Sequence, residues 1–466
     1  MAKLQVILAC VVLSSVALAG CLSEGKLALD PLPELGNVLS IDTAQPLQEQ
    51  ALFWKGPTLS AGEYPTSVRP IWDWYTCWIT GTCPSFPEPK CEPDNCQRIP
   101  FELELPEDFW DIHTGHLEVS LRYISIDDEG RGFALRILDA DGRKVAEGMD
   151  GGEGIVALVP QAPAGTYVAE IIITYGEGPY DGVIQVDAVP RDEEVHDMLP
   201  NLVTLPPTDL HIGQTNTVGC FILLCVPNPA SGAMQNAAGG RGCYLDEYAE
   251  KGARKCLRFA NRVGNVGEGP LEVRLKTTEA VKAFGAMGQH MQRVHRSDGT
   301  FTDRAAGAAH FHATHEHFHY MNLVEFRLHE FDVATETRGA QLGSAQKSGI
   351  CLVDIGLVAL GLPYTSEPNW DITCFYPMWS DENTEWHMSL SPNWFDLYTA
   401  YTNENYVDVS KVPDGVYELV ATTNVDDSVL ESDTTDNEGS VVFRLTGDKV
   451  EVLQEREGAH WNQHGA

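Results

Sequence analysis

The sequence has few basic residues for its size. It contains 31 lysines and arginines against 67 aspartates and glutamates, which gives a formal net charge of −36 at pH 7. A surface this negative repels the phosphate backbone, so nucleic acid is excluded as a partner. The same surface attracts cationic partners at low salt, but it is also typical of proteins from saline habitats. Charge alone therefore does not define the substrate.

The chain also lacks strong helical periodicity, internal repeats and the paired CxxC motifs of a structural zinc site. Over residues 98–192, apolar residues such as Leu117, Val119 and Leu121 alternate with polar ones. This pattern, broken by Gly-containing turns, predicts a small antiparallel β-sandwich. The stretch is similar to the jelly-roll modules found beside secreted enzymes, and we expect it to serve adhesion or spacing.

A second region, residues 197–447, again has short apolar runs broken by Gly, Pro, Asn and Asp. The expected fold class is therefore all-β: an N-terminal jelly-roll-like β-sandwich followed by a larger β-sandwich domain with long loops. Residues 22–97 are expected to form a tether and a Cys/Pro-rich linker, and residues 448–466 a flexible tail. Strands of the second region are expected at 256–263, 271–275, 315–328, 416–423 and 440–445.

The first residues carry an export signal. Lys3 precedes an apolar run over residues 4–16, and LAGC, which ends at Cys21, forms a lipobox. The run is too short for a convincing membrane span. Residues 1–21 are therefore expected to be a lipoprotein signal peptide, with an uncleaved anchor as the alternative. We expect the protein to be exported and held at the cell surface by insertion of acylated Cys21 into the lipid bilayer.

Export changes how the other cysteines are interpreted. Without Cys10 and Cys21, ten cysteines remain, and an oxidising compartment permits five disulfides. Sequence proximity favours the following pairs: Cys77 with Cys83, Cys91 with Cys96, Cys220 with Cys225, Cys243 with Cys256, and Cys351 with Cys374.

Histidine is concentrated in one stretch, HFHATHEHFHY, which holds five of the fifteen histidines. If this stretch is a strand, His315, His317 and His319 share a face, and their imidazoles can converge on one metal ion. His310 and His312 then point to the opposite face or begin a bend. Imidazole suits Zn, Cu, Fe or Ni, so the triplet does not select the metal. A solvated polar strand without metal is the alternative.

The segment from His312 to His319 resembles the copper-binding HxxHxHxH signature of the lysyl oxidase family. The resemblance spans roughly residues 199–447 and leaves the N-terminal sandwich outside. It implies a lysyl-oxidase-like catalytic domain at residues 197–447. Further stretches resemble landmarks of that family in the same order: LPNLVTLPPTDL, LRFANRVGNVGEGPLEV, KSGICLVD, LSPNWFDLY and VLESDTTDN.

The resemblance implies a copper amine oxidase similar to protein-lysine 6-oxidase. Cu²⁺ would be bound by the histidine triplet, and Lys347 and Tyr398 fall where the family crosslinks a lysine to a tyrosine to make its lysyl tyrosylquinone cofactor. Primary amines would be oxidised by O₂ to aldehydes, with release of hydrogen peroxide and ammonia. The amine is left open between a free diamine, a small monoamine and the side chain of peptidyl lysine. The alternatives are a metal-binding surface adhesion or copper-sequestering module without turnover, and a zinc hydrolase. Neither alternative needs Lys347 and Tyr398.

The catalytic base is left open between two residues. Asp396 lies two positions before Tyr398 and can share its strand face, whereas His312 belongs to the family signature. Either residue can instead orient a ligand histidine. An acidic cluster later in the chain offers oxygen ligands for Ca²⁺, with a solvated turn as the favoured alternative. Its members are Glu431, Asp433, Asp436 and Asn437.

Overall fold

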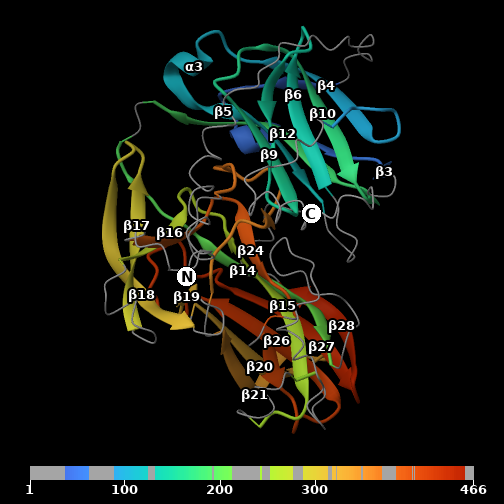
Figure 1. Ribbon diagram of the computed structural model, residues 1–466, viewed down its shortest axis with the longest axis vertical. Helices are drawn as coiled ribbons and strands as arrows, with labels where there is room; N and C mark the ends of the chain where they lie inside the picture. The colour runs from blue at the N-terminus through green and yellow to red at the C-terminus, as the bar shows by residue number, and fades with distance from the viewer. Residues whose placement is uncertain are drawn as a thin grey trace, which may run out of the picture. The chain divides into compact units, whose positions relative to one another are not determined.

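The structure is a computed structural model that divides into two compact units, Met1–Glu193 and Glu194–Ala466 (Figure 1). Within the described part of the chain, no helix is long and apolar enough to cross a membrane. The signal segment with Cys21 lies outside that part. The described residues are 37–61, 89–123, 132–191, 194–212, 242–243, 252–276, 287–312, 317–321, 323–347, 350–369, 385–400, 402 and 405–456.

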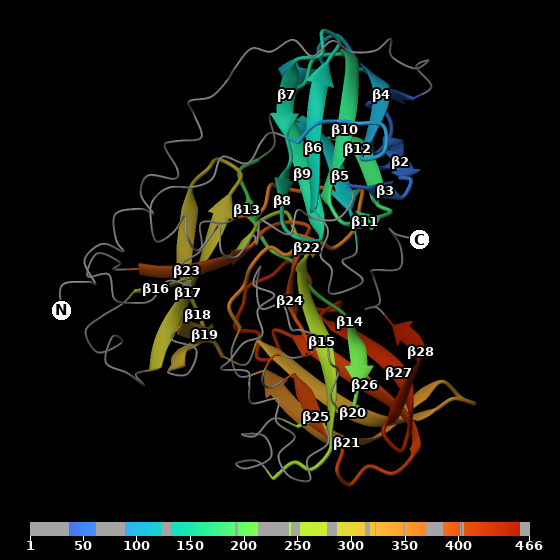
Figure 2. The ribbon, with the colours of Figure 1, turned by 45° about the vertical axis from the view of Figure 1, so that its right-hand side comes forward.

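The first unit contains two five-stranded sheets that enclose one hydrophobic core (Figure 2). The first sheet has the order β1 (Val38–Ser40), β4 (Cys96–Glu104), β10 (Gly165–Tyr175), β6 (Gly132–Asp139) and β7 (Lys144–Glu147). The second has the order β2 (Leu52–Lys55), β12 (Asp181–Pro190), β5 (His113–Arg122), β9 (Gly154–Pro160) and β8 (Met149–Asp150). Short elements add η2 (Leu47–Gln50), α3 (Phe109–Ile112), and the pair β3 (Leu59–Ser60) with β11 (Glu177–Gly178).

The core of this unit confirms the predicted alternation. Leu117, Val119 and Leu121 of β5 are fully buried in it together with Leu135 and Ile137 of β6. Side chains in a strand point alternately to its two faces, so every second residue of these strands reaches the interior. The first unit is therefore an all-β sandwich, as expected.

The predicted tether is wrong where it overlaps β1, β2 and β3. Leu39 of β1 and Leu59 of β3 are buried in the core of the first unit, and β1 pairs with β4 in parallel. These strands have only two to four residues. Such segments are shorter than the window over which a period of two can be recognised.

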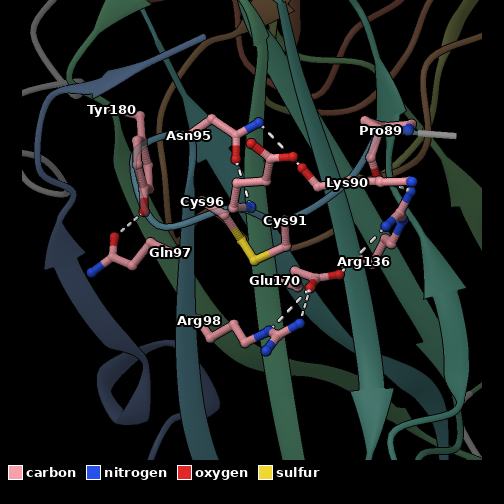
Figure 3. The surroundings of a disulfide bond; sticks show 11 residues. Pro89, Lys90, Cys91, Asn95, Cys96, Gln97, Arg98, Arg136, Glu170 and Tyr180 are labelled. Carbon is pink, nitrogen blue, oxygen red and sulfur yellow. Dashed lines mark hydrogen bonds and ion pairs between the residues drawn. A yellow bond between two sulfur atoms is a disulfide. The ribbon is translucent and has the colours of Figure 1, made fainter. Parts of the chain in front are cut away.

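A disulfide joins Cys91 to Cys96 at the start of β4, which confirms one predicted pair (Figure 3). Beside it, Glu170 of β10 is buried and accepts hydrogen bonds from Arg98 at 2.9 Å and from Arg136 at 3.5 Å. A buried carboxylate is stable when charged partners surround it in this way. The disulfide fixes the start of β4, and the ion pairs join β4 and β6 to β10.

The described residues of the second unit form three sheets. The first has the order β19 (His317–Tyr320), β18 (Phe301–His312), β17 (Met287–Arg296), β16 (Leu271–Lys276) and β23 (Glu385–Leu390), with β13 (Asp197–Met198) paired to β17. The second joins β14 (Leu202–His211), β15 (Cys256–Asn265), β24 (Trp394–Tyr398) and β22 (Gly356–Leu357), with β25 (Tyr406–Asp408) paired to β15. The third has the order β21 (Thr337–Lys347), β20 (Val324–Asp332), β26 (Gly415–Thr423), β27 (Glu438–Thr446) and β28 (Lys449–Arg456).

Two expectations for this unit are wrong. The single strand predicted over 315–328 is divided between β19 and β20, which belong to different sheets. The predicted flexible tail contains β28, which pairs along its length with β27. In both cases backbone pairing with a neighbouring strand decides the structure, and the pattern of one segment does not reveal its partner.

The cysteines of the second unit agree with the predicted pairing where they are described. Cys243 and Cys256 form a disulfide, and Cys351 is also disulfide-bonded. Cys374, the predicted partner of Cys351, lies outside the described residues, as do Cys77, Cys83, Cys220 and Cys225.

Candidate functional site

The histidine-rich stretch forms a hairpin of β18 and β19. Its antiparallel register pairs His312 with His317 and His310 with His319. Residues directly opposite each other in an antiparallel pair lie on the same face of the sheet, and so do residues two apart in one strand. These four histidine positions therefore share one face, and the expectation that His310 and His312 lie opposite to His317 and His319 is wrong. His315 lies outside the described residues.

The end of this hairpin contacts the segment that follows β21. Tyr320, the last residue of β19, donates its backbone N–H to the carbonyl of Ile350 at 3.0 Å and accepts the N–H of Ile350 at 3.3 Å. Lys347 is the last residue of β21, where it pairs with Val324. The bridge therefore brings the segment after Lys347 to the strand that carries His317 and His319.

Tyr398 reaches the same segment from β24. Its hydroxyl accepts the backbone N–H of Cys351 at 2.5 Å and donates to the carbonyl of Cys351 at 3.0 Å. Cys351 directly follows Ile350, which forms the bridge to Tyr320. The structure thus brings together the end of the histidine hairpin, residues Ile350 and Cys351, and the ring of Tyr398.

The surroundings of Tyr398 keep its phenol protonated. Burial raises its pKa well above the ordinary value, and the negative charge of Asp396 raises it further, while the hydrogen bond from Cys351 acts in the opposite direction. Asp396 is itself only 4% exposed and lies two positions earlier in β24. A carboxylate and a neutral phenol therefore stand together in a poorly hydrated place, which is suited to proton transfer.

Asp354 is a site residue to which the sequence alone gave no role. It is fully buried, and it accepts the backbone N–H groups of Asn369 at 2.7 Å and Ser391 at 2.9 Å. Burial raises its pKa to about 6, although these hydrogen bonds oppose the shift. Since Ser391 precedes β24, Asp354 fixes the Cys351 segment to the strand that carries Tyr398. The only sequence signal was its place at the end of KSGICLVD.

His290 is a second residue missed from the sequence. It is fully buried in β17 and stacks on Tyr320, with ring centroids 5.1 Å apart and planes at 12°. The hydroxyl of Tyr320 accepts the backbone N–H of Gly307 at 2.7 Å. These contacts fix the end of β19 and hence the backbone of the neighbouring His319.

The acidic cluster considered for calcium forms hydrogen bonds within the protein. Glu431 accepts the amide groups of Asn424 and Asn437 at 2.5 and 2.8 Å, and the N–H of Leu202 at 2.8 Å. The carboxylate of Asp433 accepts from the hydroxyl of Thr435. Glu431, Asp436 and Asn437 are buried, so the expected solvated turn is wrong. The hydrogen bonds of Glu431 instead hold β14 to the 424–437 loop.

The second unit is therefore an all-β domain with a histidine-rich hairpin beside a buried tyrosine. Residues 289–454 match the family model described as lysyl oxidase, which covers β18 to β27 and nearly all of β17 and β28. The match shows a lysyl oxidase family domain in the second unit, as the histidine motif predicted. Members of that family are copper amine oxidases, which are oxidoreductases. A search of the curated proteins gave no match to the chain.

Proposed function

We propose that the second unit oxidises primary amines, including the side chain of peptidyl lysine, to aldehydes with O₂, releasing hydrogen peroxide and ammonia. The observation that carries this proposal is the pair of hydrogen bonds between the Tyr398 hydroxyl and the backbone of Cys351. They hold the tyrosine next to the bridge between Ile350 and Tyr320, and so next to the histidine hairpin. A metal-binding adhesion module has no need for such a tyrosine.

The residues present fit the groups that this chemistry requires. Copper would be held by His315, His317 and His319, whose imidazoles are suitable ligands. Lys347 lies four positions before Cys351, so their α-carbons are at most about 14 Å apart. Copper and a quinone made from Lys347 and Tyr398 would supply the electron acceptor that amine oxidation needs.

The protein itself would position groups and move protons. The backbone of Cys351 fixes the ring of Tyr398, and Asp354 fixes the Cys351 segment to β24. The carboxylate of Asp396 is the proton acceptor that we assign to the α-proton of the amine, because it lies beside Tyr398 and raises its pKa. His312, opposite His317 in the hairpin, is the alternative base.

Peptide mapping tests the proposal directly. Copper-loaded, aerated protein should yield one joined tryptic species in place of the two peptides that contain Lys347 and Tyr398. It should also absorb visible light and release peroxide with at least one member of a panel of amines. Lys347→Ala and Tyr398→Phe should each abolish the absorption but retain copper, and Lys411→Ala is the matched control.

Two results would contradict the proposal. The first is the detection of both peptides separately in fully copper-loaded wild-type protein, which would mean that Lys347 and Tyr398 are not crosslinked. If that protein were also colourless and inactive with every amine, a non-catalytic metal-binding module would describe the second unit better.

We also propose that the protein is exported and held at the membrane through acylated Cys21. The lipobox motivates this proposal, and the disulfides Cys91–Cys96 and Cys243–Cys256 agree with an oxidising compartment. Cys21→Ser should move the protein from the detergent phase to the aqueous phase in a partition assay. Unchanged partition would instead indicate anchoring by an uncleaved signal segment.

A further inference from the structure

A polar cluster lies on two neighbouring strands of the first unit. In the register of β5 and β12, Asp187 pairs with His116 and Gln185 pairs with Glu118. One ligand atom each from His116, Glu118 and Asp187 lies within 4.8 Å of the other two. The two central strands of the sheet therefore present one imidazole and two carboxylates at a single place.

The cluster lies on the face of the sheet opposite the hydrophobic core. Leu117 and Val186, which alternate with the cluster residues, are packed in the core. Glu118 is nevertheless fully buried, and Asp187 is only 9% exposed. A cation bound by both carboxylates would lower the cost of burying their negative charges in a poorly hydrated place.

The imidazole offers a nitrogen for such a cation. The Nε2 atom of His116 is inaccessible to solvent and has no hydrogen-bond partner within the described residues. A buried polar atom without a partner costs free energy. A metal ion bound to Nε2 would remove this cost and at the same time offset the charges of Glu118 and Asp187.

Two neighbouring side chains orient the carboxylate of Glu118. Gln185 donates from Nε2 to one carboxylate oxygen at 2.8 Å, and the hydroxyl of Ser120 donates to the other. Such contacts are typical of metal ligands, whose orientation is set by hydrogen bonds from residues behind them.

We propose that His116, Glu118 and Asp187 bind one divalent transition-metal ion, for which Zn²⁺ is the best-suited choice. Nitrogen and oxygen ligands at about 2.1 Å from zinc in a tetrahedron lie about 3.4 Å apart, so small side-chain rotations close the site. Three protein ligands leave the fourth position to water. The site belongs to the first unit and does not depend on the amine oxidase activity proposed for the second.

The test uses the full chain with the other proposed metal site removed. In a variant with His317→Ala and His319→Ala, metal-free protein is titrated with Zn²⁺ against a chromophoric chelator. We expect one tight zinc equivalent per chain. His116→Gln should weaken binding by more than about 100-fold, and Gln185→Ala, which leaves all three ligands, by about 10- to 100-fold.

The matched control is His113→Gln. His113 lies in the same strand, but its ring stacks on Phe109 and its Nδ1 contacts the carbonyl of Phe109, outside the cluster. This variant should bind zinc with unchanged affinity. Circular dichroism verifies that each variant is folded. If His116→Gln does not fold, Glu118→Gln is titrated in its place and should show the same loss of zinc affinity. Absence of a tight zinc equivalent, or equal affinity in the ligand variant and the His113 control, would overturn the proposal.

Discussion

At the scale of single residues, we expect Tyr398 to stabilise the fold independently of the chemistry proposed for it. Its hydroxyl satisfies both the N–H and the carbonyl of Cys351. Tyr398→Phe should therefore lower the free energy of unfolding of copper-free protein by about 1–3 kcal/mol, because two backbone groups lose their partner. Urea denaturation measures this loss. Tyr417→Phe removes a hydroxyl with a single bond, to Pro413 at 2.7 Å, and is the control. An equal or larger loss in the control would contradict this role.

Asp354 gives a prediction about pH. Its pKa is raised from 3.8 to about 6 in the folded protein, so folding favours the protonated form. The contribution of Asp354 to stability is therefore largest below pH 4 and is lost as the pH rises towards 6, by about 3 kcal/mol for a shift of this size. Asp354→Asn has no such titration. Urea denaturation between pH 4 and 7 should show that the free energy of unfolding of the wild type falls relative to that of the variant. A difference between the two proteins that does not change with pH would contradict the raised pKa of Asp354.

At the scale of elements, the hairpin of β18 and β19 gives His312 a place near the proposed copper site. His312 and His317 are directly opposed, with α-carbons about 5 Å apart. His312→Ala should therefore weaken copper binding by about 10- to 100-fold even though His312 is outside the predicted triplet. A chelator competition titration measures the affinity, and His329→Ala in β20 is the control. Equal affinities in the two variants would exclude His312 from the site.

The same hairpin shows what the sequence could and could not predict. The alternation of histidines predicted that His317 and His319 share a face, because that property belongs to one strand. It did not predict that His312 joins them, because cross-strand pairing depends on where the chain reverses. Likewise, motif resemblance indicated Tyr398 and Lys347, but the contact of Tyr398 with Cys351 comes from tertiary folding of residues 47 positions apart.

Strand length set a similar limit on the fold prediction. Strands of nine or ten residues, such as β5, β15 and β26, were recognised because several apolar residues alternate within each. The segments β1, β2 and β3 contain too few residues to show a period. The sequence therefore predicted the fold class and missed the strands that complete the edges of the first sandwich.

At the scale of the whole molecule, every described sheet takes its strands from one unit only. We therefore expect two calorimetric transitions in metal-free protein. Copper should raise the transition that Tyr398→Phe lowers, and zinc should raise the other one in the variant with His317→Ala and His319→Ala. At a free metal concentration 100 times the dissociation constant, each metal should increase the free energy of unfolding of its unit by about 2.7 kcal/mol. A single transition that responds to both metals would contradict independent units.

The contact between Tyr398 and Cys351 also sets the order of events in biogenesis. It joins residues 47 positions apart, so it is absent from the unfolded chain. The proposed bond between Lys347 and Tyr398 can then form only after folding, and an incorrectly folded chain stays immature. Once formed, the bond closes a ring of about 50 residues, and the lost freedom of the unfolded chain adds about 4 kcal/mol of stability. Maturation would in this way make the folded protein more durable.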